Sequence, residues 1–421
     1  MSAAPHPVAV ASGPVDHRIR PPGSKSETIR ALAAACLAEG RSHLYGALDA
    51  DDTMAMAGVI RALGVDVATN TEPWSVDGQG GRLSPAPVPL DARESGLCAR
   101  IGMVLAGSAD GTSVLQGRGR LGERPMSSLI ANLRDLGVEI DGDRLPIEIA
   151  GHGRLWGGTI AIDCSETSQF ATALMLAAPT MKEPALLELK GLGGSVGYLE
   201  LTATTMRGFG ASVERTFTGY EVENTGYQPT DVVVEPDASA AAYPMVAAAI
   251  TGGRVTIEGL PSDSGQPDLA MTRHLRTMGC QTRSEAGEVT VIGTTGPLQP
   301  LEADLSDMPD GALALAVACL FAEGVSRLSG LGSLRHKESN RLDALSRELS
   351  RLGAGARVED DTLVVTPANL HPSIVDPHGD HRIAMAMGLV GLVVPGIAVD
   401  TPGVVDKTWP GFWTMLDDLS R

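Results

Sequence analysis

Aromatic and cysteine residues are scarce in this chain of 421 residues. Phe, Trp and Tyr together make up only 3% of it, so its hydrophobic cores must be built from aliphatic side chains. The cysteines are odd in number and far apart, and they form no Cys-x-x-Cys pair: Cys36, Cys98, Cys164, Cys280 and Cys319. That spacing argues against a zinc ribbon or a paired redox site, and we expect reduced thiols.

Positive charge is also in short supply. Lys and Arg number 33 against 51 Asp and Glu, a formal net charge of -18, which argues against a cationic face that wraps nucleic acid. Residues 1–13 show no basic region followed by an apolar block, so no secretory signal is predicted. The longest charge-free stretch, residues 383–399, contains Pro395 and Gly396 and predicts a helix, a turn and a buried strand rather than a membrane span. We expect a cytoplasmic protein.

What the chain has in abundance is a repeated pattern. Its length corresponds to two or three domains of about 150 residues, and 43% of it is hydrophobic, as in globular proteins. An Ala-rich helical run, a turn, a short strand, a polar loop and a second helix that ends in an apolar residue and Gly recur along the sequence. The closing glycines are spaced 69 to 74 residues apart: Gly64, Gly137, Gly210, Gly279 and Gly353.

Each closing glycine fits the position just after a helix, where a left-handed backbone is needed. A sixth copy of the pattern runs into the C-terminus. We therefore expect an α/β protein of six units, arranged as two domains of three units each.

The polar loops of the repeats hold the candidate functional residues. Pro22-Gly23-Ser24-Lys25-Ser26 precedes a helix with Arg30 and offers an anion site, although an ordinary Ser cap with a solvated Lys also explains it. The loop GRGRLGERP carries Arg118, Arg120 and Arg124, which repel one another unless an anion or a carboxylate such as Glu123 lies among them.

Later loops add neutral donors and carboxylates. Thr167-Ser168-Gln169, Ser195 and Tyr198 suit a polyol or a sugar-like acceptor, or serve only as helix caps. The second half supplies further charged groups: Asp304, Asp307, Asp310, Arg335 to Arg341, Asp380-His381-Arg382 and Lys407. A metal at His378, Asp380 and His381 is disfavoured because Arg382 adjoins them and no second ligand cluster exists. A surplus of Arg and Lys with a few carboxylates suits phosphate and carboxylate substrates and proton transfer.

Taken in order, these segments resemble the enolpyruvyl transferases, and among them the 5-enolpyruvylshikimate-3-phosphate synthase (3-phosphoshikimate 1-carboxyvinyltransferase) family. The resemblance extends from about Arg20 to Leu416. It rests on a series of short motifs: PGSKS with Arg30, LDADDT, Gly96-x-x-x-Arg100, ERP at 123–125, TSQF at 167–170, PDASAA, DMPDGA, HKESNRL, GDHRIAM and DKTWP.

The resemblance implies a fold of two lobes, each an inside-out α/β barrel of three βαβαββ repeats with its helices inside. One lobe would span residues 21–234, the other residues 1–20 with 235–421, and the active site would lie in the cleft where the lobes close. A monomer without metal or organic cofactor is expected.

The family transfers the enolpyruvyl group of phosphoenolpyruvate to the 5-hydroxyl of shikimate 3-phosphate and releases phosphate, a step of the shikimate pathway toward chorismate and aromatic amino acids. By resemblance Asp310 is the base, Glu338 the proton donor, and Lys25 assists both. The implied shikimate 3-phosphate contacts are Lys25, Ser26, Arg30, Thr167, Ser168, Gln169, Ser195, Tyr198, Asp310 and Lys337. The implied phosphoenolpyruvate contacts are Lys25, Gly96, Arg124, Gln169, Arg341, Arg382 and Lys407.

Three segments depart from the family pattern. Glu94 and Leu97 stand where most members have Asn and Thr, Val196-Gly197 replaces Lys-Pro, and Ile29 replaces Asn. A carboxylate about 4 Å from a phosphate would cost about 4 kcal/mol, so Glu94 must turn away, be protonated or pair with an Arg. A specialised enolpyruvyl transferase for another acceptor, or a non-catalytic ligand-binding protein, remain the alternative interpretations.

Overall fold

The computed structural model describes residues 4–191, 194 and 196–421. The chain forms two compact units. Unit 1 combines the residues up to Pro22 with Glu235–Arg421, and unit 2 is the intervening Gly23–Val234. Each unit has its own hydrophobic core.

Unit 2 contains three repeats of the order strand, helix, strand, helix, hairpin. The first consists of β14 (Asp231–Val233), α1 (Lys25–Leu37), β3 (Glu39–Tyr45), α2 (Asp51–Ala62), β4 (Asp66–Ala68) and β5 (Trp74–Gln79). The second consists of β6 (Leu90–Asp91), α3 (Gly96–Gly107), β7 (Asp110–Gln116), α4 (Ser127–Asp135), β8 (Glu139–Asp141) and β9 (Ile147–His152). The third consists of β10 (Gly158–Asp163), α5 (Gln169–Ala177), β11 (Ala185–Lys190), α6 (Val196–Gly208), β12 (Val213–Arg215) and β13 (Gly219–Val222).

Unit 1 follows the same plan. Its first repeat consists of β2 (Asp16–Ile19), α7 (Ala238–Thr251), β15 (Arg254–Ile257), α8 (Met271–Thr277), β16 (Gln281–Glu285) and β17 (Glu288–Ile292). The second consists of β18 (Glu302–Asp304), α9 (Ala312–Cys319), β19 (Ser326–Ser329), α10 (Arg341–Arg351), β20 (Gly355–Glu359) and β21 (Thr362–Thr366). The last consists of β22 (Ser373–Val375), α11 (His381–Gly391), β23 (Ile397–Val399) and α12 (Phe412–Leu419). Short 3₁₀ turns lie in the loops at Gly119–Glu123, Ala178–Thr180, Pro267–Ala270, Gly332–His336 and Pro402–Lys407.

Each complete repeat builds one four-stranded sheet with the same strand order. The first strand pairs in parallel with the second, which pairs antiparallel with the last strand of the hairpin, as in β10-β11-β13-β12. In the last repeat β1 (His6–Pro7) pairs antiparallel with β23 in place of a hairpin. The sheets stay separate, so the repeats enclose helices without closing into one continuous barrel.

The first repeat of each unit takes its first strand from a distant part of the chain. In unit 2, β14 pairs with β3, which precedes it by almost the whole unit, through Asp231 opposite His43. In unit 1, β2 pairs with β15 through Asp16 opposite Arg254. Each connection between the units therefore begins just after a strand of the unit that the chain leaves: β2 in unit 1 and β14 in unit 2.

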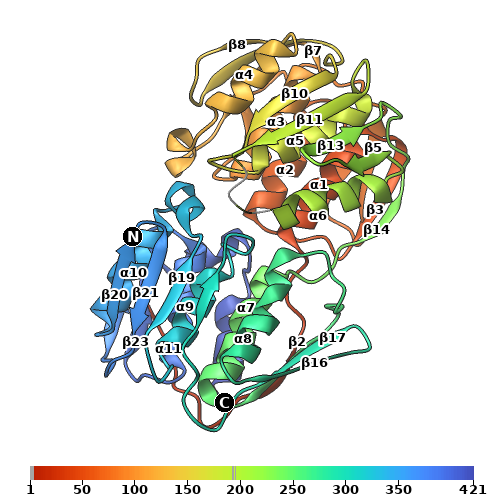
Figure 1. The fold of residues 1–421 in the computed structure, drawn as a ribbon. Helices are drawn as coiled ribbons and strands as arrows, with labels where there is room; N and C mark the ends of the chain where they lie inside the picture. Colours follow the sequence, from red (N-terminus) through yellow and green to blue (C-terminus); the bar gives the residue numbers. More distant parts are fainter. Residues whose placement is uncertain (1–3, 192–193, 195) are drawn as a thin grey trace. The chain divides into compact units, whose positions relative to one another are not determined.

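One helix of every repeat is almost entirely buried: α1, α3 and α5 in unit 2, and α7, α9 and α11 in unit 1 (Figure 1). Their sequences explain this, because runs such as ALALAVAC in α9 contain no charged residue. Burying a Leu or Val side chain contributes about 1.5 to 3 kcal/mol. The second helix of a repeat is amphipathic, as α10 shows with only one face in the core.

The sequence correctly predicted the repeat boundaries and the aliphatic cores. All five closing glycines have positive φ, from 81° at Gly210 to 103° at Gly353. Core residues are mostly Ala, Leu, Val, Ile and Met, while unit 1 gathers several of its few aromatic rings around Phe412, which contacts Tyr243, Trp409 and Trp413.

The five cysteines, expected to be reduced, are free, and all of them are buried. Burial raises the pKa of the Cys36 thiol to about 12, so its reactive thiolate form is suppressed. Residues 383–399 form most of α11, a turn and β23, as the sequence predicted. Among the described residues, no helix is long and apolar enough to cross a membrane.

Candidate active site

Several of the predicted site residues lie at or just before the first turns of the buried helices. Lys25 begins α1, Gly96 begins α3 and Gln169 begins α5 in unit 2. In unit 1, Asp310 lies just before α9, and Arg382 is the second residue of α11. Helix N-termini present backbone N–H groups and a partial positive charge, which favours anions at these positions.

The first loop of unit 2 is both a helix cap and a charge site. The Ser24 hydroxyl accepts a hydrogen bond from the Glu27 amide, which confirms the capping interpretation. Lys25 is not a solvated side chain, however. It is only 13% exposed, and its Nζ lies 3.3 Å from the carboxylate of Asp52 on α2. The buried carboxylate fixes the position of the ammonium group at the start of α1.

Arg30 is a buried cation held by neutral oxygens. It is 2% exposed and donates to the Thr202 and Thr172 hydroxyls and to the backbone oxygens of Ser26 and Tyr198, at 2.8 to 3.4 Å. Burial lowers its pKa to about 10, partly offset by Tyr198 and Glu27. Four of the five guanidinium N–H groups are used in these bonds. Arg30 therefore ties α1 to α5 and α6 and holds the segments that carry Ser26 and Tyr198.

Gly96 leaves room for two arginines. A Cβ atom added to it would lie 2.5 Å from Nη1 of Arg100 and 2.5 Å from the guanidinium of Arg124. Both arginines are buried. Arg100 donates from Nη1 to the side-chain oxygen of Gln169 and from Nη2 to the backbone oxygen of Pro125, each at 2.8 Å. Gly96, Arg124 and Gln169 are thus brought together, with Arg100 among them.

The loop GRGRLGERP separates its three arginines. Arg120 pairs with Glu123 at 3.1 Å, as the charge-cluster interpretation requires, whereas Arg124 turns inward over Gly96. Arg118 is exposed. The side chain of Glu94, which departs from the family pattern, is directed toward the same loop, since a Cβ atom on Gly119 would lie 2.7 Å from its Oε1.

The neutral donors of the third repeat lie at the start of α5 and α6. Ser168 occupies the residue before α5, and the Thr167 hydroxyl accepts a hydrogen bond from the Gln169 amide. Tyr198 is in the first turn of α6 and is partly buried. Ser195, also predicted, lies outside the described residues.

Unit 1 concentrates its charges around one arginine. Arg341 is 1% exposed and contacts three carboxylates: Asp310 at 2.8 Å, Glu338 at 2.7 Å and Asp380 at 2.7 Å. Burial alone would lower its pKa, but the fields of Asp380, Glu338 and Asp310 outweigh it, and the pKa is raised. The guanidinium is therefore a permanent positive bridge between the predicted base, Asp310, and the predicted proton donor, Glu338.

Three more cations complete this group. Lys337 Nζ lies 3.4 Å and Arg382 Nη2 3.1 Å from Asp310, and Lys407 Nζ lies 3.9 Å from Glu338. We call these residues the unit 1 cluster: Asp310, Lys337, Glu338, Arg341, Asp380, Arg382 and Lys407. It holds four cations and three carboxylates, an excess of one positive charge before any substrate enters.

The residues considered as metal ligands have other partners. Asp380 accepts hydrogen bonds from Arg341, from Ser339 and from the Arg382 amide, and through the last of these it caps α11. His378 contacts the buried Glu348 at 3.0 Å. In the part of the chain that the structure describes, no group of three or more His, Cys, Asp and Glu could hold a metal ion.

A protein-family model described as EPSP synthase (3-phosphoshikimate 1-carboxyvinyltransferase) matches residues 10–416. The chain belongs to this family. A 3-phosphoshikimate 1-carboxyvinyltransferase of Methanoculleus marisnigri is 39% identical over 412 residues, which cover 96% of this chain and 97% of the relative. A protein of the same name from Rhizobium leguminosarum is 38% identical, with 96% and 95% covered.

Solved structures share the fold. The EPSP synthase of Acinetobacter baumannii superposes with a TM-score of 0.80 at 24% identity, and covers 98% of this chain and 97% of its own. The enolpyruvyl transferase NikO of Streptomyces tendae gives a TM-score of 0.73 at 20% identity, with 99% and 97% covered. These likenesses show the two-lobed enolpyruvyl transferase architecture.

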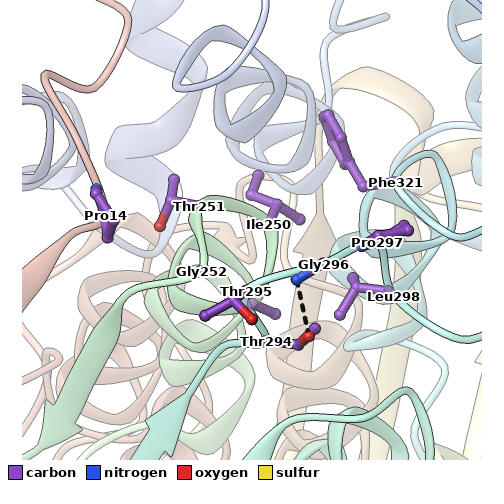
Figure 2. Close-up of a pocket in the computed structure, with 11 residues that line it drawn as sticks. Pro14, Ile250, Thr251, Gly252, Thr294, Thr295, Gly296, Pro297, Leu298 and Phe321 are labelled. Carbon is purple, nitrogen blue, oxygen red and sulfur yellow. Dashed lines mark hydrogen bonds between the residues drawn. The ribbon is translucent and has the colours of Figure 1, made fainter.

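A pocket of about 470 Å³ in unit 1 is unrelated to the EPSP synthase motifs. It lies at the C-terminal ends of α7 and α9, away from the helix starts that carry the cluster, and is lined by apolar groups such as Ile250, Leu298 and Phe321 (Figure 2). Its polar side chains are threonines, and the Thr294 hydroxyl already accepts a hydrogen bond from Gly296. None of its lining residues can act as an acid or a base.

Sequence reasoning assigned no role to three buried residues of the site: Asp52, Arg100 and Asp380. Each lies inside a quoted family motif, LDADDT, Gly-x-x-x-Arg or GDHRIAM. The motifs located them, but their contacts with Lys25, Gln169 and Arg341 depend on how separate helices pack.

Proposed function

We propose that this protein transfers the enolpyruvyl group of phosphoenolpyruvate to the 5-hydroxyl of shikimate 3-phosphate, with release of phosphate. The observation that carries the proposal is the unit 1 cluster, in which one buried guanidinium contacts Asp310 and Glu338 at 2.8 and 2.7 Å. Membership of a family whose curated relatives carry this activity in their name supports it.

The cluster has the charges that two anionic substrates require. Guanidinium groups bind carboxylate and phosphate through paired hydrogen bonds, each worth about 1.5 to 3 kcal/mol. We assign Arg124, Arg341, Arg382 and Lys407 to phosphoenolpyruvate, together with Lys25, Gly96 and Gln169. We assign Ser26, Thr167, Ser168, Ser195, Tyr198 and Lys337 to shikimate 3-phosphate, with Arg30 holding two of these segments in place.

The proton transfers follow from the two carboxylates. In the proposed reaction Asp310 accepts the proton of the 5-hydroxyl as its oxygen bonds to the central carbon of phosphoenolpyruvate. Glu338 delivers a proton to the methylene carbon, which becomes a methyl group in a tetrahedral ketal phosphate. The carbon–oxygen bond to phosphate then breaks while Glu338 takes a methyl proton back, and the enol ether forms. The proton held by Asp310 leaves with the released phosphate, so both carboxyl groups return to their starting states. Three cations lie within 3.4 Å of Asp310 and offset the negative charge of its carboxylate.

The direct test is phosphate release from phosphoenolpyruvate with and without shikimate 3-phosphate, in the presence of a chelator. We expect release only when both substrates are present. An acceptor-dependent reaction that shikimate 3-phosphate does not support, but another alcohol does, would instead favour a specialised enolpyruvyl transferase. Activity that the chelator abolishes and a divalent cation restores would contradict the metal-free mechanism.

We also propose a reducing cytoplasmic compartment for the reaction. The five buried thiols, none of them in a disulfide, support it, because structural disulfides predominate in oxidising compartments. Fractionation of the native organism with an antibody against the chain would test this location.

A further inference from the structure

Arg100 is placed to organise two groups that the proposed function assigns to phosphoenolpyruvate. It lies in the second turn of α3, is 1% exposed, and its guanidinium carbon lies 5.3 Å from the centre of the Phe170 ring. The ring, which follows Gln169 on α5, restricts the tilt of the planar guanidinium. The side chain is therefore held in one orientation between two buried helices.

The contact with Gln169 fixes which way its amide points. A guanidinium can only donate hydrogen bonds, so the Gln169 atom that lies 2.8 Å from Nη1 must be the oxygen. The NH₂ group of the same amide is then directed away from Arg100. Gln169 is thereby committed to act as a hydrogen-bond donor at the start of α5, which suits an anionic substrate oxygen.

The second contact acts on Arg124. Nη2 of Arg100 donates to the backbone oxygen of Pro125, the residue that follows Arg124. Nη1 of Arg100 and Nη2 of Arg124 each lie 2.5 Å from the position of a Gly96 Cβ, so these nitrogens are at most about 5 Å apart. Two like charges this close require a fixed backbone to hold them, and the Pro125 contact provides it.

We propose that Arg100 is a positioning residue for phosphoenolpyruvate binding, which orients the Gln169 amide and the Arg124 segment without touching the substrate. The inference rests on the proposed function and adds a route by which one side chain controls two substrate contacts. It makes the effect of Arg100 on phosphoenolpyruvate binding depend on Gln169.

The experiment measures KM for both substrates and kcat in Arg100→Met, Arg100→Lys, Gln169→Ala and the double variant Arg100→Met with Gln169→Ala. Arg100→Met should raise KM for phosphoenolpyruvate about tenfold and change kcat less. Gln169→Ala should do the same. In the double variant KM for phosphoenolpyruvate should rise about as much as in either single variant. It should not rise a hundredfold, the product of the two single effects, because both substitutions act on one contact. Arg100→Lys retains the charge but reaches only one acceptor, and should be intermediate.

Gln169→Glu keeps the hydrogen bond from Arg100 but removes the N–H group that residue 169 would offer to the substrate. A carboxylate still accepts from Arg100, so the unfolding midpoint should not fall, yet no N–H remains for the substrate and KM for phosphoenolpyruvate should rise at least tenfold. The matched control is Arg134→Met in the same unit. Arg134 also donates to two backbone oxygens, those of Ile140 and Gly142, but lies outside the site, and its loss should leave KM unchanged.

The outcomes are distinguishable. An inactive wild type overturns the proposed function, and the role of Arg100 in it as well. If the wild type is active, two results would overturn only this inference. One is an unchanged KM for phosphoenolpyruvate in Arg100→Met. The other is a KM increase in the double variant that equals the product of the two single increases. If Arg100→Met does not fold, Arg100→Lys and Gln169→Glu decide, since both keep a hydrogen bond across the contact.

Discussion

Two buried arginines, Arg341 in unit 1 and Arg30 in unit 2, have opposite surroundings. Arg341 contacts three carboxylates, and Arg30 donates to two hydroxyls and two backbone oxygens. The pKa of Arg341 is raised and that of Arg30 is lowered to about 10. The difference shows that the same residue type has two roles: in unit 1 the guanidinium contacts the carboxyl groups proposed to transfer protons, while in unit 2 it holds backbone segments in place.

The largest effect should come from removing the base that Arg341 holds. Asp310→Asn keeps the size of the side chain and one acceptor oxygen but cannot take a proton, so turnover should fall about 10² to 10⁴-fold. Acceptor binding should change much less. Steady-state kinetics with both substrates would measure this. A fall in turnover of less than about tenfold would mean that another group accepts the proton.

Replacing each of the two arginines should lower the unfolding free energy by different amounts. Arg341→Met leaves three carboxylates near one another without their bridge, and should cost about 3 to 5 kcal/mol of unfolding free energy. Urea titration followed by far-UV circular dichroism would measure it.

Arg30→Met is the matched comparison. It leaves only neutral oxygens without a donor, so the expected cost is about 1 to 3 kcal/mol. Equal losses in the two variants would contradict the distinction between charged and neutral surroundings.

Acid should lower the unfolding free energy of unit 1 through His274, a residue of α8. Burial lowers the pKa of His274 to about 4, with Arg273 contributing. The unfolded chain, with a pKa of about 6.5, binds the proton more readily, so stability from this group is complete above pH 6.5 and declines toward pH 4. At pH 5 the loss should be on the order of 2 kcal/mol.

His274→Asn should remove that part of the pH dependence. The measurement is the difference in unfolding free energy between pH 7 and pH 5 for the wild type and the variant. Identical differences would show that His274 is not held in its neutral form.

The smallest effect is expected at the position that departs from the family pattern in α3. Leu97 is 8% exposed and apolar, whereas the anion contacts proposed nearby come from Arg124 and Gln169. Leu97→Thr should therefore change KM for phosphoenolpyruvate by less than about threefold. If the wild type is nearly inactive with shikimate 3-phosphate and Glu94→Asn with Leu97→Thr raises its turnover, this loop marks a different acceptor.

The repeats could be predicted from sequence because each needs a left-handed residue after its second helix, and only glycine adopts that backbone at little cost. The partners of the charged residues could not. The sequence around Lys25 is also that of a solvated lysine, and only the packing of α2 places Asp52 beside it. The three arginines of GRGRLGERP cannot be told apart in the sequence, although only Arg124 turns inward. Such contacts depend on residues far apart in the chain, which a local pattern does not record.

The pairing of β2 with β15 has a consequence for biosynthesis. Residues 23–234, which form unit 2, leave the ribosome after Asp16–Ile19 but before Arg254–Ile257. Unit 2 therefore has all its strands while β2 still has an open edge, and an open edge is a place where another chain can add. At about 5 to 20 residues per second, the roughly 240 residues from β2 to the end of β15 take tens of seconds to synthesise, and during that time nascent β2 can be covered by a chaperone.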